Sequence, residues 1–521
     1  MPRTPNSKDQ SGLDRLLRRT RLGMPVIGME SEFNVWLDEV EVDPREYWGH
    51  PGAFIDRPLL PREKTSLQLP TGGAVYFDRG VIEVVTPVIE LAPHSTARMV
   101  RNLWEQIGFV RDQLTKWEKA SGHTVRLKAY SSHYNISYEV PKKEQSATRN
   151  EKALALLLTY ILPVPVMLIA SNRRSTGVGV RPRGGRIEVT VDFTPDPGLM
   201  IAAATLIVGI VREVMSWPSY DLSILDNLPI PFVDGVVPGK HTTRKGWLTK
   251  DFHYPQSPYT SDVNASIWTT QFGETISLRT MAARVAWFFR FSIRKYSDPF
   301  SMRLLFAVLF GRAPSLLELA DRPAAYDDVG HLCRWGSVLH ELMNYGIESG
   351  LMPSKPTTID DHVIERTNAR RVHLLERETH KAAYAKTPVA LPPPPAVPPS
   401  PRATYSRRTT PRKLLPSRAA QYLDRRGTSL MSGNGLSRER RSADRRKTSY
   451  NTPFPDRRLT RSVYEQVFLR LVSGGKLRMG QELYSPIGMK GWYHAIFRRD
   501  SDGTERVLTI DQLLQRMRDW I

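Results

Sequence analysis

The chain has 521 residues, of which 40% are hydrophobic, and a formal net charge of +21. It is longer than one ordinary domain and apolar enough for a large core. Its single cysteine, Cys333, excludes an internal disulfide framework and fits a reducing compartment, so we expect a cytoplasmic protein. The net charge suggests a polyanion partner, but +13 of it falls in residues 387–461, where 17 Lys and Arg face 4 Asp and Glu.

No membrane segment or secretory signal is expected. The N-terminus is polar and lacks an apolar stretch. The apolar run Ala153–Ala170 is interrupted by Pro163 and Pro165, and the run Leu199–Val211 is only about 20 Å long as a helix, against about 30 Å for a bilayer. We interpret both runs as buried core helices.

The first part of the chain predicts strands that carry carboxylates. Residues 1–23 form a basic lead-in with a short helix at Leu13–Leu22, and Val26–Leu37 is a strand with Glu30 and Glu32 on one face. Asp43–Pro70 is rich in proline and charge and predicts a long irregular loop. Residues 72–87 predict a hairpin: its first strand ends at Asp78, Arg79-Gly80 is the turn, and Glu83 lies on the second strand.

A long amphipathic helix, His94–Ser121, separates this hairpin from two further strands. Val125–Tyr138 places His133 and Asn135 on one face. Gly184–Phe193 alternates strictly, with Arg186, Glu188, Thr190 and Asp192 on one side and apolar residues on the other. Arg173, Arg174, Arg181 and Arg183 precede this strand in what we expect to be a loop, and a proline-flanked helix begins near Leu199.

The remainder is predicted to be mainly helical, followed by a linker and a small module. The expected helices are Leu199–Trp217, Ser277–Lys295, Ser301–Phe310, Tyr326–Ile347 and Thr358–Ala385, with a long excursion at Ile230–Thr275. Pro388–Pro401 is proline-rich and Ala403–Arg461 is basic with few bulky hydrophobes, so we expect a disordered linker. A helix at Val463–Val472, a hairpin around Asp500–Gly503 and a helix at Ile510–Ile521 complete the chain.

These elements predict an α+β fold in which helices pack on a curved, mostly antiparallel sheet. The expected domains are a flexible N-terminus at 1–23, a catalytic domain at 24–386, a linker at 387–461 and an α+β module at 462–521. One concave face of the sheet should carry the carboxylates and the histidine, which are Glu30, Glu32, Glu83, His133 and Glu188.

Several carboxylates with one imidazole suit Mg²⁺ or Mn²⁺ better than structural zinc, which favours cysteine. Carboxylates beside arginines also suit a metal–nucleotide site, because guanidinium groups bind phosphate oxygens. Taken singly, glutamates at i and i+2 are common on solvated strands and a lone histidine is usually structural. Their combination favours a site.

The motifs resemble those of the glutamine-synthetase-like carboxylate–amine ligase superfamily. Gly28-Met29-Glu30-Ser31-Glu32-Phe33 resembles its first metal-binding strand. Asn172-Arg173-Arg174-Ser175, Arg181-Pro182, Arg186-Ile187-Glu188 and Pro195-Asp196-Pro197 resemble the ATP-site segment of glutamine synthetases. The Gly-Ala-Val-Tyr-Phe-Asp stretch and the His133-Tyr134-Asn135 strand look closest to the branch of the Pup ligase and depupylase, which are proteasome accessory factors.

The resemblance implies ATP and Mg²⁺ as cofactors and a role for each site residue. One metal would be held by Glu30, His133 and Glu188, and another by Glu32 and Glu83. Asp78 would be the catalytic base or nucleophile. The nucleotide would be bound by the residues Asn135, Arg173, Arg174, Arg181 and Arg186. Thr190 stands where glutamine synthetases carry an arginine for the substrate carboxylate, and no ammonium site is evident, so free glutamate and ammonia are disfavoured.

Three functions remain open from the sequence. The first is a ligase that joins a carboxylate, with a small protein modifier as one candidate, to an amine through an acyl phosphate. The second is an amide or isopeptide hydrolase of the same fold, with nucleotide as a structural cofactor. The third is a polyanion-binding protein that uses the basic linker, although this segment lacks the interleaved aromatic residues that stack on bases. The excursion Ile230–Thr275 and the C-terminal module are the expected specificity elements.

Overall fold

A computed structural model describes residues 22–63, 65–175, 177–241, 245–318 and 462–521. All of them belong to one compact unit of the chain, and a second unit, residues 336–447, lies outside them. Several predicted features lie outside the described residues: the helices Tyr326–Ile347 and Thr358–Ala385, the linker 387–461 and Cys333. The predicted helix Leu13–Leu22 also lies outside them, except for its last residue.

The described residues form a mixed α+β fold, as predicted, around one large curled sheet. Its main strand order is β11-β12-β9-β10-β8-β1-β6-β5-β4-β3-β16-β17-β18, and every pair is antiparallel except the parallel pair of β3 and β16. The strands up to the hairpin are β1 (Val26–Leu37), β2 (Val40–Val42), β3 (Leu60–Arg62), β4 (Ser66–Gln68), β5 (Ala74–Asp78), β6 (Val81–Val85) and β7 (Ile89–Glu90). Those that follow are β8 (Val125–Ser137), β9 (Val178–Pro182), β10 (Arg186–Val191), β11 (Gly239–Lys240) and β12 (Trp247–Thr249).

Strand β1 shows how the sequence builds this sheet. Its residues alternate between fully buried and partly exposed along all 12 positions, so one face is apolar and packs into the core. Phe33 and Val35 of this face are completely buried. Strand β1 pairs with β8 along almost its whole length and with β6 on its other side, and a bulge between Glu32 and Phe33 shifts the β8 register.

The hairpin of β5 and β6 has the predicted two-residue turn. Asp78 lies opposite Val81, and Arg79 and Gly80 both have positive φ, at 44° and 88°. Two central residues with positive φ define a type I′ turn, whose twist matches the right-handed twist of paired strands. This turn sets the register that places Tyr76 opposite Glu83.

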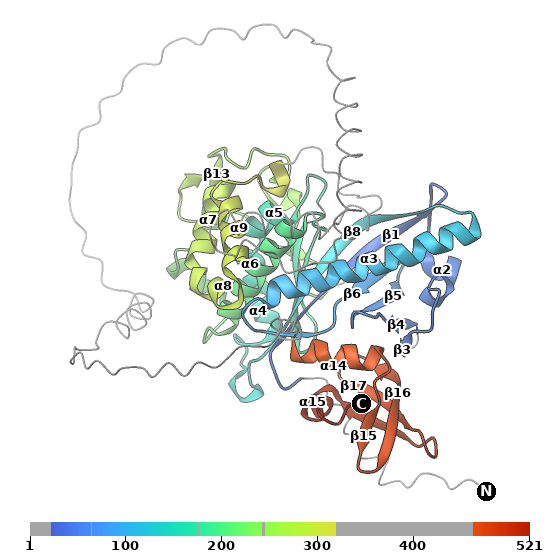
Figure 1. Ribbon diagram of the computed structural model, residues 1–521. Coiled ribbons are helices and arrows are strands. Elements are labelled where there is room, and N and C mark those ends of the chain that lie inside the picture. The colour runs from blue at the N-terminus through green and yellow to red at the C-terminus, as the bar shows by residue number, and fades with distance from the viewer. Residues whose placement is uncertain (1–21, 64, 176, 242–244, 319–461) are drawn as a thin grey trace, which may run out of the picture. The chain divides into compact units, whose positions relative to one another are not determined.

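The long helix α3 (Ser95–Ser121) covers the apolar face of the sheet and runs along β1 (Figure 1). Phe193, just after β10, packs edge-on against Phe33 at 5.4 Å and Trp104 of α3 at 5.3 Å between ring centroids. These three aromatic rings connect the helix to the sheet. Each such pair stabilises the fold by about 0.5–1.5 kcal/mol beyond the free energy of the area it buries.

The other helices pack together beside the sheet (Figure 1). They are α4 (Glu151–Ile161), α5 (Pro163–Ala170), α6 (Pro197–Met215), α7 (Leu278–Phe288), α8 (Arg290–Tyr296) and α9 (Pro299–Leu309). Pro163 ends α4 as predicted, and α5 continues at an angle of 66°. Short strands and 3₁₀ turns complete this region: η2 (Lys142–Glu144), η3 (Leu222–Asn227), η4 (Asp251–His253), β13 (Trp268–Thr269), β14 (Thr275–Ile276) and η5 (Leu316–Glu318).

Helix α6 is longer than the apolar run Leu199–Val211 suggested, because Asp196 caps its N-terminus and it continues to Met215. Its 19 residues span about 28 Å, so the length argument against a membrane span does not hold. By length and composition α6 passes as a span, and the bent pair α4–α5 passes if taken as one. Of the apolar window of α6, however, 83% is buried within the protein, as in the core helix of a globular fold.

Four local expectations were wrong. The segment 43–70 is not irregular but contains α2 (Pro44–Trp48), η1 (Pro51–Ala53), β3 and β4. The arginine-rich loop before β10 contains a strand, β9, which pairs with β10. The predicted helix Ser277–Lys295 is interrupted at Phe289. The final helix ends at Gln515, and Trp520 instead forms a bridge with Leu477. Pairing with distant segments accounts for β3, which pairs with β16, and for the bridge of Trp520, whereas α2 and the β9–β10 hairpin form through nearby residues.

The C-terminal residues have a hydrophobic core of their own, built around Tyr464, Phe468 and Phe497. Their elements are α14 (Val463–Val472), β15 (Leu477–Met479), β16 (Glu482–Lys490), β17 (His494–Arg499), β18 (Glu505–Thr509) and α15 (Ile510–Gln515). Both α14 and α15 begin with a capping box, at Ser462 and Thr509. Glu465 of α14 also accepts a hydrogen bond from Asn102 of α3 at 3.1 Å.

Candidate functional site

The strand registers bring the predicted carboxylates and the histidine to one face of the sheet, which we call the polar face. Glu30 lies opposite His133, Glu32 opposite Glu83, and Glu188 opposite both Asn135 and Arg181. Directly opposed residues in an antiparallel pair project to the same side. The apolar face of the same strands packs into the core, so the polar face is the side available for a site.

Glu30, His133 and Glu188 form the centre of the polar face. Each offers a ligand atom, and these atoms all lie within 4.8 Å of one another. His133 Nδ1 is 3.0 Å from Glu30 Oε1. Burial raises the pKa of Glu30, but the hydrogen bond and charge of His133 outweigh it, and the pKa lies well below its usual range. Burial alone would lower the pKa of His133, but the Glu30 contact raises it.

A second acidic pair adjoins this centre. Glu32 and Glu83 lie directly opposite each other on β1 and β6, and Tyr76 Oη donates a hydrogen bond to Glu83 Oε1 at 2.5 Å. Burial, followed by the charge of Glu30, raises the pKa of Glu83 well above its usual value. Carboxylates crowded in this way fit a divalent cation, which would relieve their mutual repulsion.

Tyr76 was not singled out in the sequence. The two-residue turn at Arg79-Gly80 contained the necessary signal, because it fixes residue 76 opposite residue 83. Burial, followed by the charge of Glu83, raises the pKa of the Tyr76 phenol well above its usual value. Tyr76 therefore remains a neutral hydrogen-bond donor to the acidic cluster.

Three arginines surround the carboxylate of Glu188, which is fully buried. Arg181 forms a buried ion pair with it, Arg183 Nε lies 3.0 Å from Glu188 Oε2, and Arg186 lies at 3.9 Å. Arg186 Nε also donates to Asn135 Oδ1 at 2.7 Å. In this structure the arginines already neutralise Glu188, so a metal ion there would compete with Arg181 for the carboxylate.

The structure does not bring Arg173 and Arg174 to this cluster. Both are exposed, and Arg173 Nε donates to the backbone oxygen of Leu317 at 3.1 Å. The backbone N–H of the neighbouring Asn172 donates a hydrogen bond to Asp192 Oδ2. Asp192 lies four residues beyond Glu188, which is about 13 Å along a strand. Strand β9 separates the two groups of arginines, and it was not foreseen.

A basic cleft of about 810 Å³ opens beside the arginines. It lies at the tips of the β9–β10 and β11–β12 hairpins and near the start of α4. Its charged lining is mostly basic, and Lys240 Nζ lies 4.6 Å from the centre of the Trp247 ring. The basic residues that line it are Lys152, Arg183, Arg186, Lys240 and Lys245. Such a cleft suits a polyanionic ligand such as a nucleoside triphosphate.

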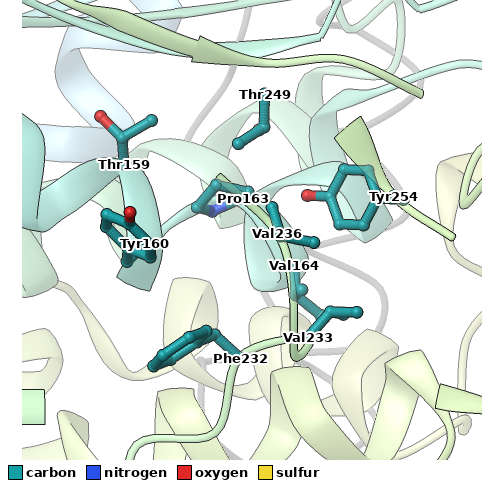
Figure 2. A pocket seen from close by; sticks show the side chains of 9 residues that line it. All are labelled: Thr159, Tyr160, Pro163, Val164, Phe232, Val233, Val236, Thr249 and Tyr254. Atoms are coloured by element: carbon teal, nitrogen blue, oxygen red, sulfur yellow. The ribbon is translucent and has the colours of Figure 1, made fainter. Parts of the chain in front are cut away.

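A smaller cavity lies where α4 meets α5 and is lined mainly by apolar side chains, among them Tyr160, Pro163 and Phe232 (Figure 2). Its volume is only about 10 Å³. This is close to the minimum needed for one water molecule, so the cavity is a packing defect of the core and not a ligand site.

Thr190 and His241 border the polar face on the side of β9. Thr190 lies opposite His133, and its Oγ1 is 3.4 Å from His241 Nε2. Burial, followed by the charge of Arg181, lowers the pKa of His241 to about 4. His241 is therefore neutral at physiological pH. It was not foreseen, because it reaches the site from the excursion.

Asp78 lies at the edge of the polar face, at the end of β5. It has the same strand parity as Tyr76, and it is exposed. Among the described residues its carboxylate has no hydrogen-bond or ion-pair partner. Aspartates beside turns often cap them by accepting a hydrogen bond from a backbone N–H, and Asp78 makes no such bond to the described residues.

No protein-family model matches the chain, and no curated protein matches it. Among solved structures, it is similar to a chain in the crystal structure of the complex between the prokaryotic ubiquitin-like protein Pup and its ligase PafA. The match has a TM-score of 0.34 and 12% sequence identity, and it covers 63% of this chain and 70% of the other. The likeness is one of structure, and the two sequences share little.

Proposed function

We propose that this protein is an ATP- and Mg²⁺-dependent ligase that joins a carboxylate to an amine. One observation carries the proposal: the cluster of Glu30, His133 and Glu188 lies on the same face as the second acidic pair and beside a cleft lined by basic side chains. Acidic groups that suit cations and basic groups that suit phosphates thus adjoin each other. This is the arrangement that phosphoryl transfer from a metal-bound nucleotide requires.

Each group on the polar face would have a distinct task. Glu30, His133 and Glu188 would hold one Mg²⁺ and Glu32 with Glu83 another, and the ions would neutralise charge on the phosphates. Arg183 and Arg186 would bind phosphate oxygens in the basic cleft. Arg181 orients Glu188, since its guanidinium forms a buried ion pair with that carboxylate.

The chemistry has two steps. A carboxylate oxygen of the acyl substrate attacks the γ-phosphorus of ATP, ADP leaves, and an acyl phosphate forms. The nitrogen of the amine then attacks the acyl carbon, phosphate leaves, and the amine proton passes to Asp78. The carboxylate of Asp78 is exposed and has no partner within the part of the chain that the structure describes, which suits a general base at the edge of the site. Holding the reactants together contributes on the order of 7–11 kcal/mol to such a reaction.

A hydrolase that cleaves an amide or isopeptide bond is the second candidate. The observation that favours it is again the exposed carboxylate of Asp78, which has no partner among the described residues and would attack a carbonyl carbon as a nucleophile. The two functions differ in nucleotide use, because the ligase consumes one ATP for each bond and the hydrolase does not.

The deciding experiment is a hydroxylamine trap. Purified protein is incubated with ATP, Mg²⁺, hydroxylamine and a panel of carboxylates that includes glutamate, acidic peptides and Pup, the protein bound by the ligase in the similar structure. A ligase yields ADP and a hydroxamate in equal amounts, and only with its own carboxylate. Cleavage of amide-linked substrates without ADP would favour the hydrolase. Failure to bind Mg²⁺–ATP would contradict both.

A further inference from the structure

Arg62 belongs to the polar face, although it lies in the segment 43–70 that was expected to be irregular. In the sheet, Arg62 of β3 lies opposite Ser66 of β4, and Gln68 of β4 lies opposite Ala74 of β5. Residues two apart on a strand share a face, as do directly opposed residues. Arg62 therefore projects to the same side as Tyr76 and Glu83.

The C-terminal module holds this arginine in place. Arg62 Cζ lies 4.3 Å from the centre of the Trp492 ring, which comes from the turn between β16 and β17. Arg62 also pairs with Met489 of β16, in the parallel pair that joins β3 to β16. Its Nη1 donates to Ser66 Oγ at 3.1 Å. An indole face stabilises a guanidinium and fixes the plane in which its donors lie.

The guanidinium is not satisfied by these contacts. Its Nε is buried and has no hydrogen-bond partner, and no carboxylate of the described residues lies within the 4.0 Å of an ion pair with Arg62. Burial lowers the pKa of Arg62, and the nearby charges of Tyr76, Glu63 and Glu83 act against it. A buried charged donor without a partner costs free energy, and an incoming anion would remove that cost.

We propose that Arg62 binds the carboxylate substrate, and that Trp492 positions it, so that the C-terminal module forms part of the substrate site. This inference rests on the proposed ligase function. The planar guanidinium presents paired donors that match a carboxylate, which a lysine does not. Arg62 and the basic cleft lie on opposite sides of Glu30 and His133 in the strand order, so nucleotide and carboxylate would approach the acidic cluster from opposite ends.

The test measures carboxylate binding apart from turnover. The full-length protein is saturated with Mg²⁺ and a non-hydrolysable ATP analogue, and glutarate is titrated by calorimetry. Arg62→Gln should weaken glutarate binding by about tenfold or more, since a hydrogen bond to a charged group is lost. Arg62→Lys should recover part of the loss, because the charge returns without the fork. Trp492→Leu should weaken glutarate binding less than Arg62→Gln.

Arg57→Gln is the matched control. Arg57 also lies over an aromatic ring, Phe109, at 5.1 Å, and it is exposed. Its replacement should leave glutarate binding unchanged, and none of the four variants should change the affinity for the Mg²⁺–nucleotide complex. Thermal unfolding verifies that each variant is folded. If the Arg62→Gln variant does not fold, the results for Arg62→Lys and Trp492→Leu decide the test.

The outcomes separate this inference from the proposed function. If the unaltered protein does not bind the nucleotide, the ligase function itself is contradicted. Nucleotide binding with no glutarate binding, or with equal glutarate affinity in Arg62→Gln, overturns the inference alone. The inference is also overturned if the only effect of Arg62→Gln is tighter binding of Mg²⁺, since Arg62 would then merely balance the charge of the acidic cluster.

Discussion

Glu32 of β1 and Glu83 of β6 lie directly opposite each other in the sheet, and the negative charge of Glu30 also acts on Glu83. Like charges in this position destabilise an antiparallel pair. The protein reduces the repulsion in two ways: Tyr76 donates a hydrogen bond to Glu83, and the pKa of Glu83 rises with burial and the charge of Glu30. A divalent cation would remove the repulsion altogether.

Metal should therefore stabilise the protein. We expect Mg²⁺ or Mn²⁺ at 100 times the dissociation constant to add about 2.7 kcal/mol to the free energy of unfolding. Thermal unfolding in EDTA and in Mg²⁺ measures the difference. The double variant Glu32→Gln/Glu83→Gln should lose the part of the response that comes from the ion at this pair. An unaltered protein that melts at the same temperature in both solutions would rule out the metal site.

Glu188→Gln should destabilise the protein even without ligand. It leaves the buried Arg181 guanidinium without its counter-charge, which typically costs 3–5 kcal/mol. It should also weaken Mg²⁺–ATP binding, measured by calorimetry. The control is Glu505→Gln, which breaks the exposed pair with Arg498 and should change stability by no more than about 0.5 kcal/mol. Equal effects of the two variants would contradict the buried role of Glu188.

Asp78→Asn should behave in the opposite way. Because its carboxylate has no partner among the described residues, we expect stability and ATP affinity to be nearly unchanged while turnover is lost. Asp502→Asn in the β17–β18 turn is the matched control: its carboxylate caps Thr504 N, and its loss should leave turnover intact. Full activity of Asp78→Asn would remove the catalytic assignment.

Phe33→Ala tests the packing that holds the polar face. The Phe33 ring is completely buried against Phe193, and losing such a ring costs about 3–5 kcal/mol. Urea unfolding provides the value. Phe252→Ala removes the same ring from a side chain that is 72% exposed, and it should have little effect. A small loss for Phe33→Ala would mean that the sheet face can rearrange around the cavity.

Deletion of residues 388–461 should leave the melting temperature of the remaining protein unchanged. This prediction rests on composition alone, since the segment has too few apolar residues to offset about 1–2 kcal/mol of backbone entropy per ordered residue. Differential scanning calorimetry of the full-length and shortened chains makes the comparison. A clear decrease in the melting temperature would show that the segment packs on the rest of the protein.

The sequence by itself determined the local parts of the site. Strict alternation places Glu30 and Glu32 together, and the Arg79-Gly80 turn sets the partner of each residue in the hairpin. Pro163 ends helix α4 whatever the tertiary surroundings, because proline lacks the N–H that continues the helical hydrogen bonds. These signals depend on a few adjacent residues, so one sequence suffices to read them.

Only the tertiary structure decided which distant strands became neighbours. It joined β9 to β12, and it joined β3 to β16, which placed Arg62 against Trp492. Short strands such as β3 and β9 have little propensity of their own and form because a partner completes their hydrogen bonds. Each of the two also has a partner far away along the chain, β16 for β3 and β12 for β9, and no local pattern identifies these partners.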